Sequence, residues 1–269
     1  MSNLLISTLF SSSKGNCTYI RKNGEEFLID AGISARAIEC SLKQLGSSLA
    51  NIKGIFITHE HSDHIKGLEI VSKHYHIPIY APTLSAAHIG CISDNVRDLI
   101  NIIDDGESVE FSELSFKAYR TPHDSKSSVC YKVDFGTEKL GYATDIGHIS
   151  DRVLDALIGC EYIVLESNHD IDMLKQGAYP FNLKKRILGK YGHLSNSSCA
   201  ELVPLLVSKG AVSILLAHLS DENNKPAIAF NESYKALMSK NMKITTKQAI
   251  GDVYLNIASK KEQSVLIYK

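Results

Sequence analysis

Apolar residues alternate or run together in short stretches through the first half of the chain, a pattern that predicts many strands and few helices. The expected strands are Leu4–Phe10, Cys17–Arg21, Glu26–Asp30, Lys53–Thr58, Ile77–Tyr80, Glu107–Phe111, Leu114–Thr121, Ser128–Phe135 and Lys139–Thr144. The pair Asn23-Gly24 predicts a hairpin turn before the third of these strands. Two helices are expected here, one capped by Ser34 and ended by Gly46, the other over Gly67–His76.

The second half alternates between helical and strand patterns. Helices are expected at Asp151–Ile158, Ser197–Lys209 and Pro226–Ser239, with helical turns from Asp170. Strands are expected at Tyr162–Glu166, Val212–Ala217, Lys243–Ala249, Val253–Ile257 and Ser264–Tyr268. Many early strands followed by β-α alternation indicate an α/β fold in which helices cover two sheets.

Composition sets the broad class of the chain. Its 269 residues, 44% hydrophobic and 22% charged, are typical of a globular protein and fit one domain over residues 1–269. The net charge of -1 provides no overall basic field, so a polyanionic partner would need a local basic patch. Six scattered cysteines without a CxxC pair favour free thiols in a reducing compartment over disulfides or a cysteine zinc site.

The chain shows no sign of a targeting or membrane segment. Its first residues lack the basic region of a signal peptide and read as a strand. No apolar stretch approaches the ~18 residues that a membrane span requires. We therefore expect a soluble cytoplasmic protein without a membrane partner.

The segment after the predicted strand Lys53–Thr58 carries the densest cluster of potential metal ligands, namely His59, His61, Asp63 and His64. Imidazole and carboxylate suit divalent ions such as zinc and manganese. His59 and His61 lie two apart and project the same way from an extended segment, whereas Asp63 and His64 follow where the chain could turn into a helix. One loop could therefore serve two metal ions; a surface loop with incidental histidines is the alternative.

Polar residues also follow four further predicted strands. They are His123, Asp145, the pair Asn168 and His169, and His218. Strand ends are rigid points at which side chains from distant parts of a sequence can meet. The pattern predicts one site assembled at strand ends, with an ordinary strand-end side chain as the alternative for each residue.

These residues, in the order His59-x-His61-x-Asp63-His64, His123, Asp145 and His218, resemble the metallo-β-lactamase superfamily over nearly the whole chain. The resemblance implies an αββα sandwich, two mixed sheets flanked by helices, with a two-metal site at one edge. It implies that His59, His61 and His123 bind one metal, that Asp63, His64 and His218 bind the second, and that Asp145 bridges the two. Asp30 would be a buried carboxylate that orients the loop ligands, with a structural turn residue as the alternative.

Two metals in such a site have a defined chemistry. About 3.5–4 Å apart, they can share a water molecule, lower its pKa and present hydroxide to an electrophile. Nitrogen and oxygen ligands suit either Zn²⁺ or Mn²⁺, and the sequence does not choose between them. Glu60 and Ser62 lie between the ligands and are expected to be spacers.

Two features narrow the substrate. Asp145 supplies oxygen where zinc β-lactamases of this superfamily use cysteine, and those enzymes are secreted, which disfavours a β-lactamase. The segment Tyr191–Asn196 contains His193 and resembles the Gly-His-Leu-Ser motif of the phosphodiesterase and nuclease branches. There the histidine contacts the scissile phosphate or assists the leaving oxygen, as a histidine outside the metal ligands can. A helix-capping segment with an incidental histidine is the alternative.

Two further segments could contact phosphate. The basic run at residues 182–190 leads into His193, so its cations could track a phosphate backbone; a solvated helix face is the alternative. The predicted loop at residues 11–16 contains Ser12 and Ser13, and its backbone N–H groups could approach a phosphate closely.

Together with Leu165–Asp170 and Gly177–Pro180, these motifs look like those of the YycJ (WalJ) group, small bacterial exonuclease-like members of the superfamily. The resemblance implies a metal-dependent nuclease acting on DNA from the 5′ end. Asn168, His169 and Ser195 are further candidates for substrate contact, although a structural role for His169 is an equal alternative. The chain has neither a β-CASP insertion nor an RNase Z-like arm, so its core domain or a partner subunit must hold the nucleic acid.

We therefore predict a two-metal phosphodiesterase acting on nucleic acid, expected to be a 5′ to 3′ DNA exonuclease. Asp63 is expected to orient the attacking hydroxide, and His193 to stabilise charge or protonate the leaving group. A small-molecule metallohydrolase, either a cyclic phosphodiesterase or a glyoxalase-like thioesterase, is the main alternative. A nucleic-acid-binding scaffold that keeps its metals is a second. The oligomeric state is left open by the sequence, with a dimer among the options.

Overall fold

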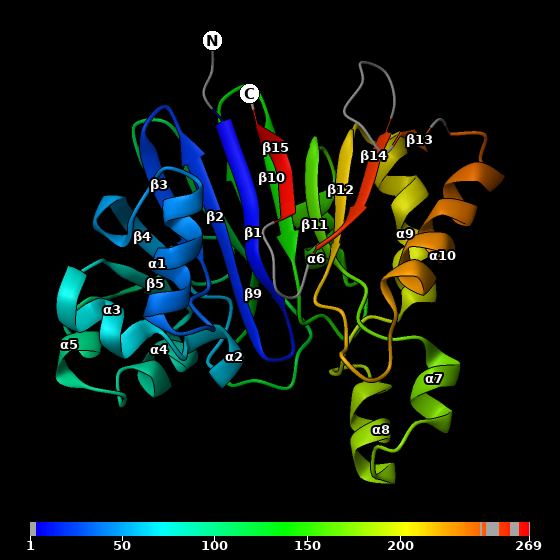
Figure 1. Cartoon of the computed structure of the whole chain (residues 1–269), viewed down its shortest axis with the longest axis horizontal. Coiled ribbons are helices and arrows are strands. Elements are labelled where there is room, and N and C mark those ends of the chain that lie inside the picture. The colour runs from blue at the N-terminus through cyan, green and yellow to red at the C-terminus, as the bar shows by residue number, and fades with distance from the viewer. Residues whose placement is uncertain (1–3, 243, 246–252, 259–263, 269) are drawn as a thin grey trace. The chain divides into compact units, whose positions relative to one another are not determined.

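The computed structural model describes residues 4–242, 244–245, 253–258 and 264–268 of the chain (Figure 1). Two compact units are present. One comprises Met1–Arg120, Ser125–Val129 and Ser259–Lys269, and the other comprises Thr121–Asp124 and Cys130–Ala258. No helix among the described residues is long and apolar enough to cross a membrane, and no disulfide links the six cysteines, all of which are described. The single domain predicted over residues 1–269 stays a prediction.

A seven-stranded mixed sheet organises the first unit, in the order β15-β1-β2-β3-β4-β5-β6. The strands are β1 Leu4–Ser12, β2 Gly15–Lys22, β3 Glu25–Ile29, β4 Ile52–Phe56, β5 Ile79–Ala81, β6 Ile100–Ile102 and β15 Ser264–Tyr268. Strands β15 to β3 pair antiparallel, whereas β3 to β6 pair parallel. Because β3 and β4 run the same way, Asp30 at the end of β3 lies beside the segment that follows β4, and its N–H donates to Phe56 O at 2.9 Å.

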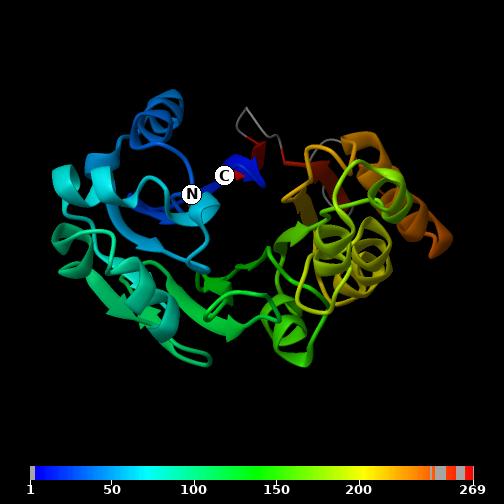
Figure 2. The same cartoon turned by 90° about the horizontal axis from the view of Figure 1, so that it is seen from below.

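Short helices and a hairpin complete the first unit. They are α1 Ala35–Gln44, α2 Ser62–Ile65, α3 Leu68–Tyr75, α4 Thr83–Ile89, α5 Asp94–Arg97, a 3-10 turn at Leu49–Asn51, and the hairpin strands β7 Ser108–Glu110 and β8 Ser115–Arg120. Helices α1, α3, α4 and α5 gather on one side of the sheet in both views (Figures 1 and 2). Ile38 of α1, Val71 of α3 and Ile55 of β4 are fully buried in one apolar core, which seals that face.

Six neighbouring strands organise the second unit, in the order β13-β14-β12-β11-β10-β9. The strands are β9 Val129–Asp134, β10 Lys139–Ala143, β11 Tyr162–Glu166, β12 Ser213–Ala217, β13 Ile244–Thr245 and β14 Val253–Ile257. Strand β9 pairs antiparallel with β10, and the other neighbours pair parallel. The carboxyl ends of β10, β11 and β12 therefore share one edge, the usual place for a site in such sheets.

The helices of the second unit are α6 Asp151–Leu157, α7 Ile171–Gln176, α8 Phe181–Ile187, α9 Asn196–Ser208 and α10 Pro226–Ser239. Helices α9 and α10 lie side by side in both views (Figures 1 and 2). Lys184 of α8 donates through Nζ to Lys175 O of α7 at 2.8 Å, which ties these two short helices together.

The observed elements confirm the predicted fold class of two mixed sheets with flanking helices. The predicted loop at residues 11–16 is wrong in its bounds. Ser11 pairs with Asn16, and Ser12 with Gly15, so β1 and β2 continue to a turn at Ser13 and Lys14. The sequence did not predict α4, α5 or β6. Helix α8 falls on the basic run at residues 182–190, for which a solvated helix face was the alternative. Of the strand predicted at Lys243–Ala249, Ile244–Thr245 forms β13, and the remaining positions lie outside the described residues.

Candidate metal centre

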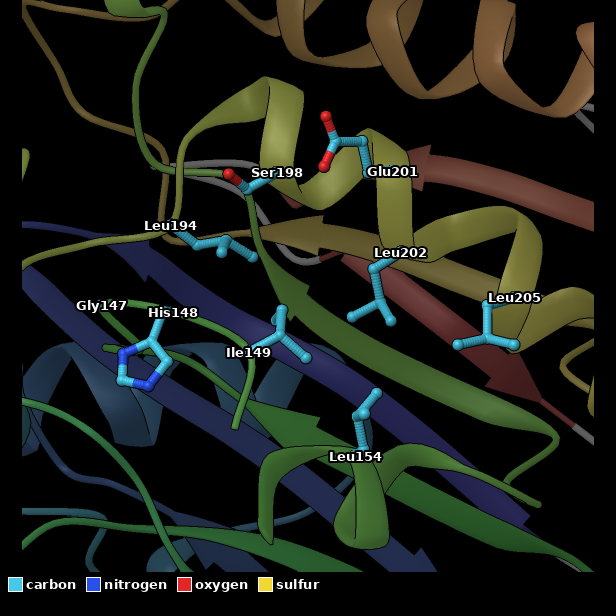
Figure 3. Close-up of a pocket in the computed structure, with 9 residues that line it drawn as sticks. All are labelled: Gly147, His148, Ile149, Leu154, Leu194, Ser198, Glu201, Leu202 and Leu205. Carbon is cyan, nitrogen blue, oxygen red and sulfur yellow. The ribbon is translucent and has the colours of Figure 1, made fainter. Parts of the chain in front are cut away.

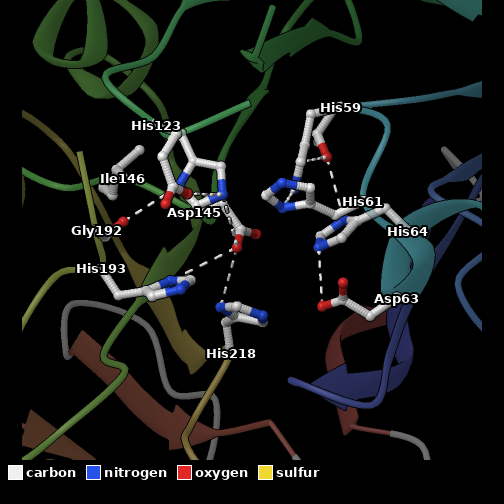
Figure 4. Close-up of polar contacts among 12 residues, drawn as sticks. His59, His61, Asp63, His64, His123, Asp145, Ile146, Gly192, His193 and His218 are labelled. Atoms are coloured by element: carbon white, nitrogen blue, oxygen red, sulfur yellow. Dashed lines mark hydrogen bonds and ion pairs between the residues drawn. The ribbon is translucent and has the colours of Figure 1, made fainter. Parts of the chain in front are cut away.

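The histidine-rich loop of the first unit brings its four predicted ligands together. It leaves the end of β4 and enters α2, with His61 at the N-cap, so the helical turn predicted for Asp63 and His64 is present. His59 Nε2 lies 3.0 Å from His61 Nδ1, and the ring centroids of His59 and His64 are 4.1 Å apart. His64 Nε2 lies 3.5 Å from Asp63 Oδ2 (Figure 4). His59 and His64 are fully buried, whereas His61 and Asp63 are half-buried.

Asp30 holds this loop from beneath and sets the tautomer of one imidazole. His64 Nδ1 lies 2.8 Å from Asp30 Oδ2, while Thr58 N donates to Asp30 Oδ1 at 2.9 Å. A carboxylate only accepts, so Nδ1 of His64 carries the hydrogen and Nε2 is the nitrogen able to bind a metal. Burial raises the pKa of Asp30, and His64 opposes that effect only in part. This geometry fits the orienting position that the family resemblance implied for Asp30.

Two neighbouring residues fix the rest of the loop. Glu60 accepts from Lys126 N at 2.7 Å and from Ser85 Oγ, so its side chain anchors the loop and does more than the spacer that the sequence predicted. Asn16 Nδ2 lies 3.1 Å from His64 Nε2 and 3.4 Å from Asp63 Oδ2, a contact the sequence did not reveal. The one sequence feature that pointed to Asn16 was its place in the motif at residues 11–16.

A buried carboxylate, Glu166 at the end of β11, is the centre of the cluster in the second unit. Its Oε1 lies 2.8 Å from His193 Nδ1 and 2.9 Å from His218 Nδ1. Its Oε2 accepts from Ile146 N at 2.8 Å and from Leu194 N at 3.2 Å. Because the carboxylate only accepts, both imidazoles carry their hydrogen on Nδ1, which leaves Nε2 for a metal or a substrate.

The same contacts set the charges in this cluster. Burial opposes ionisation of Glu166, but His193 and His218 outweigh it and lower the pKa of Glu166 to about 2. Burial likewise opposes protonation of His193, but Glu166 and Asp145 outweigh it and raise the pKa of His193. Burial lowers the pKa of His123 and so favours the neutral imidazole, which is the form that binds metals.

Asp145 lies among these imidazoles. Its Oδ1 is 3.6 Å from Nδ1 of His193, 3.6 Å from Nδ1 of His218 and 3.8 Å from Nε2 of His123 (Figure 4). Asp145, Glu166, His193 and His218 each have one potential ligand atom, all within 4.8 Å of one another. Because Glu166 accepts from Nδ1 of both imidazoles, Asp145 and His218 are the candidate ligands of this group, and Glu166 and His193 lie beside them. Asp145 and His218 both have φ of 55°, a left-handed conformation that costs roughly 1–2 kcal/mol and is typical of functional sites.

His123 and His193 are brought together by a close backbone approach. His123 Nδ1 donates to Gly192 O at 3.2 Å, so its Nε2 faces Asp145. A Cβ on Gly192 would lie 2.1 Å from Ile187 O, so only glycine allows the chain to fold back from α8 at this point. The imidazole of His193 is 21% exposed, although Glu166 beneath it is fully buried.

The five predicted substrate contacts have varied surroundings. In the first unit, Ser12 is buried and accepts from Lys14 N at 3.2 Å, and Ser13 is exposed in the turn. In the second, Asn168 Nδ2 donates to His218 O at 2.8 Å, and Ser195 Oγ caps α9 by accepting from Ser198 N at 3.1 Å. Asn168 and Ser195 therefore have structural roles, and direct contact with substrate stays a prediction for all of these residues.

His169 differs from the other candidates. It is 2% exposed, and within the described part of the chain its Nδ1 has no hydrogen-bond partner. Burial lowers the pKa of His169 to about 4, so the imidazole is neutral near neutral pH. Its position fits both alternatives that the sequence left open, contact with substrate and a structural role.

A separate cavity of about 390 Å³ lies in the second unit (Figure 3). It is lined by Gly147, His148, Ile149, Leu154, Leu194, Ser198, Glu201, Leu202 and Leu205. Its walls are mainly aliphatic, and the one fixed charge among these nine residues is the carboxylate of Glu201. The cavity therefore does not suit a phosphate group.

Sequence reasoning did not assign a role to Glu166. The signal was present, because Glu166 is the one charged residue of β11, whose sequence is Tyr-Ile-Val-Leu-Glu, and it ends the strand. A carboxylate placed fully inside a sheet needs hydrogen-bond donors around it, and such donors are often histidine ligands of a metal.

Comparison with known proteins places the chain in a family. Residues 25–218 match the model of the Beta-lactamase superfamily domain. The chain belongs to the metallo-β-lactamase superfamily. It is a metal-dependent hydrolase of this superfamily, in agreement with the cluster of ligand atoms around Asp145.

Two relatives within the superfamily match most of the chain. The chain is 35% identical over 230 residues to Exodeoxyribonuclease YycJ of Bacillus anthracis, which covers 84% of this chain and 86% of the relative. It is 30% identical over 229 residues to Exodeoxyribonuclease WalJ of Streptococcus pneumoniae, with 83% and 84% covered. The metallo-β-lactamase fold protein YhfI from Bacillus subtilis has a TM-score of 0.68 at 12% identity, covering 98% of this chain and 100% of that one. This last likeness supports the fold.

Proposed function

We propose that this metallohydrolase cleaves phosphodiester bonds in nucleic acid, as a DNA exonuclease that starts at the 5′ end. The observation that carries the proposal is the 35% identity to Exodeoxyribonuclease YycJ over 84% of the chain. The arrangement of His193 on Glu166 supports it, because a phosphodiesterase needs a group that assists the leaving oxygen.

In this proposal, seven residues hold two divalent ions, Zn²⁺ or Mn²⁺: His59, His61, Asp63, His64, His123, Asp145 and His218. The donor set fits such ions because it consists of imidazole nitrogens and carboxylate oxygens. Asp30 and Glu166 support it by fixing Nδ1–H on His64 and His218. When bound, the ions supply Lewis acidity toward the phosphoryl oxygens and lower the pKa of a water molecule.

The side chains of the protein perform the remaining steps. Asp63, which is half-buried, orients the attacking water with its carboxylate. His193 has its Nδ1 held by Glu166 at 2.8 Å and its imidazole 21% exposed, so Nε2 can contact a phosphate or the leaving oxygen. Glu166 prevents rotation of the imidazole and so keeps Nε2 directed at the substrate.

A side-by-side assay tests this function. We expect release of nucleotides from 5′-phosphorylated DNA with Mn²⁺ or Zn²⁺ and none with chelator. His193→Ala should lower the rate by about 10²–10⁴-fold, because it removes a general acid or charge-stabilising group. His88→Ala, which changes an exposed histidine of α4, is the matched control and should keep the wild-type rate.

Three comparisons complete the assay: single- and double-stranded DNA, RNA, and bis(p-nitrophenyl) phosphate. Turnover of the small diester alone would contradict the nuclease proposal and favour a small-molecule hydrolase. Labels at the 5′ and 3′ ends report the polarity of degradation.

Metal content provides a second prediction. The wild-type protein should retain about two divalent ions per chain after dialysis, measured by inductively coupled plasma mass spectrometry. Asp63→Ala removes a ligand of one ion and should reduce the content to about one. Glu69→Ala, an exposed carboxylate of α3, is the control. Two ions retained by Asp63→Ala would exclude Asp63 as a ligand.

A further inference from the structure

An exposed surface on and after α8 is not used by the proposed chemistry. We call it the α8 surface and define it by Phe181, Lys185, Leu188, Lys190 and Tyr191. Its three apolar side chains, Phe181, Leu188 and Tyr191, are 78%, 42% and 51% exposed. No residue of α8 is buried, and Phe181 has the largest exposed fraction among the large hydrophobic side chains of the described residues.

Apolar side chains and cations alternate along this surface. Phe181, Lys185 and Leu188 are spaced i, i+4 and i+7, so the helix presents them on one face. Lys190 Nζ lies 5.1 Å from the ring centroid of Tyr191, a cation–π contact. Residues 181–191 include four lysines and arginines and no acidic residue, although the whole chain has a net charge of -1. The surface is therefore locally positive and apolar together.

The α8 surface is attached firmly beside His193. Arg186 of α8 pairs with Asp124, the neighbour of His123, through Nη2 to Oδ1 at 3.1 Å. His193 N donates to Ile187 O at 3.1 Å, so the last turn of α8 packs directly on the residue that assists the leaving group. A polymer whose phosphate reaches His193 therefore passes close to this surface.

We propose that the α8 surface binds the single-stranded part of a DNA substrate, with bases stacked on Phe181 and Tyr191 and phosphates near Lys185 and Lys190. The inference rests on the proposed function and names the form of DNA that the site receives. Exposed rings accept any base because every base has a flat π face, and cations beside them hold the backbone. Paired bases inside a duplex have their faces covered, so this surface distinguishes single strands from duplex.

An anionic membrane is the alternative partner for a surface that is both basic and apolar. The seven residues of α8 form too short a helix for a continuous apolar face, and Arg186 is already paired with Asp124. These observations favour DNA as the partner. Binding to anionic lipid vesicles is measured alongside binding to DNA to test the alternative.

Binding is measured by fluorescence anisotropy of the metal-loaded protein with a 5′-phosphorylated phosphorothioate oligothymidylate that resists cleavage. Phe181→Leu keeps an apolar side chain but removes the ring, and we expect about tenfold weaker binding of the single strand. Tyr191→Ala should have a similar effect, whereas Tyr191→Phe should bind like the wild type because the ring remains. Blunt duplex should bind equally to all variants.

The contribution of the two lysines is tested by the dependence of binding on salt concentration. Lys185→Ala and Lys190→Ala should each reduce the slope of log Kd against log salt by about 0.7, the value for one phosphate contact on a single strand. Tyr75→Ala, a 37% exposed tyrosine of α3, is the control for loss of a surface ring. Melting curves confirm that each variant is folded.

Three results would overturn the inference. The first is wild-type affinity of Phe181→Leu for the single strand. The second is an equal loss of affinity for single strand and duplex in the ring variants, and the third is a variant of the α8 surface that loses binding to phosphatidylserine vesicles but keeps its affinity for DNA. Because the assay requires no cleavage, it gives its answer even if the proposed nuclease activity proves wrong. If the protein cleaves DNA but the α8 substitutions leave its affinity for single-stranded DNA unchanged, only this inference is contradicted.

Discussion

Glu166→Gln is expected to lower the rate of DNA cleavage by at least about 10²-fold and to weaken metal binding about 10–100-fold. Glu166 accepts from four donors, two imidazoles at Oε1 and two backbone N–H groups at Oε2. A glutamine amide accepts at one end only. No orientation of the amide therefore satisfies all four donors.

Each orientation of that amide has a specific cost. With its oxygen toward His193 and His218, its NH₂ faces the N–H groups of Ile146 and Leu194, and buried donors without acceptors cost about 1–3 kcal/mol each. With its NH₂ toward the imidazoles, both must place their hydrogen on Nε2, and His218 with a protonated Nε2 cannot bind a metal. Loss of stability or loss of metal must follow.

Turnover of 5′-phosphorylated DNA, metal content and melting temperature measure these effects together. Glu201→Gln, which changes an exposed carboxylate of α9, is the matched control and should leave all three unchanged. Wild-type turnover together with wild-type metal content in Glu166→Gln would show that Glu166 does not set the tautomers of His193 and His218.

Gly32→Ala is expected to destabilise the protein by about 3 kcal/mol or more, because overpacking against rigid atoms is costly. A Cβ at this position would lie 1.6 Å from Asp63 O and 2.8 Å from Asn16 N. Both are backbone atoms, so no side-chain rotation relieves the overlap. The clash also displaces Asp63, and we expect activity to fall in whatever fraction of the protein still folds.

Urea denaturation compares this variant with Gly24→Ala, in which the new Cβ meets nothing within 4 Å. Gly24 has φ of 89°, so alanine there suffers only from its left-handed conformation, roughly 1–2 kcal/mol. If the two variants lost equal stability, the contact between Gly32 and the loop of Asp63 would not be the cause.

Local pattern was sufficient for most elements of the fold. Strand β11 begins at Tyr162 and ends at Glu166 as predicted, because an apolar run of that length is bounded by polar residues. Ser34 accepts from Ala37 N and caps α1, as its residue type predicted. The hairpin of β1 and β2 extends further than predicted because serine and asparagine at residues 11–16 suggest a loop, whereas cross-strand pairing keeps them extended.

In the candidate site, too, some features follow from local sequence and others from the tertiary structure. The order and types of His59, His61, Asp63 and His64 are local properties, so the sequence alone indicated a metal site. The part played by Asp30 was an expectation from resemblance, and its contact with His64 rests on the parallel pairing of β3 with β4. Ser195 caps α9, a role that depends on where the helix begins, and its expected contact with substrate stays a prediction.

By itself, then, the sequence indicated the candidate metal ligands, because residue identity and spacing along a strand or loop are encoded locally. Only the tertiary structure decided that His64, His193 and His218 carry their hydrogen on Nδ1, because Asp30 and Glu166 accept from that nitrogen. Glu166 contacts His218 across 52 positions because β11 and β12 run parallel in one register. It contacts His193 across 27 positions because the chain folds back after α8 at Gly192. Hydrogen bonds over such separations depend on strand order, which no local pattern contains.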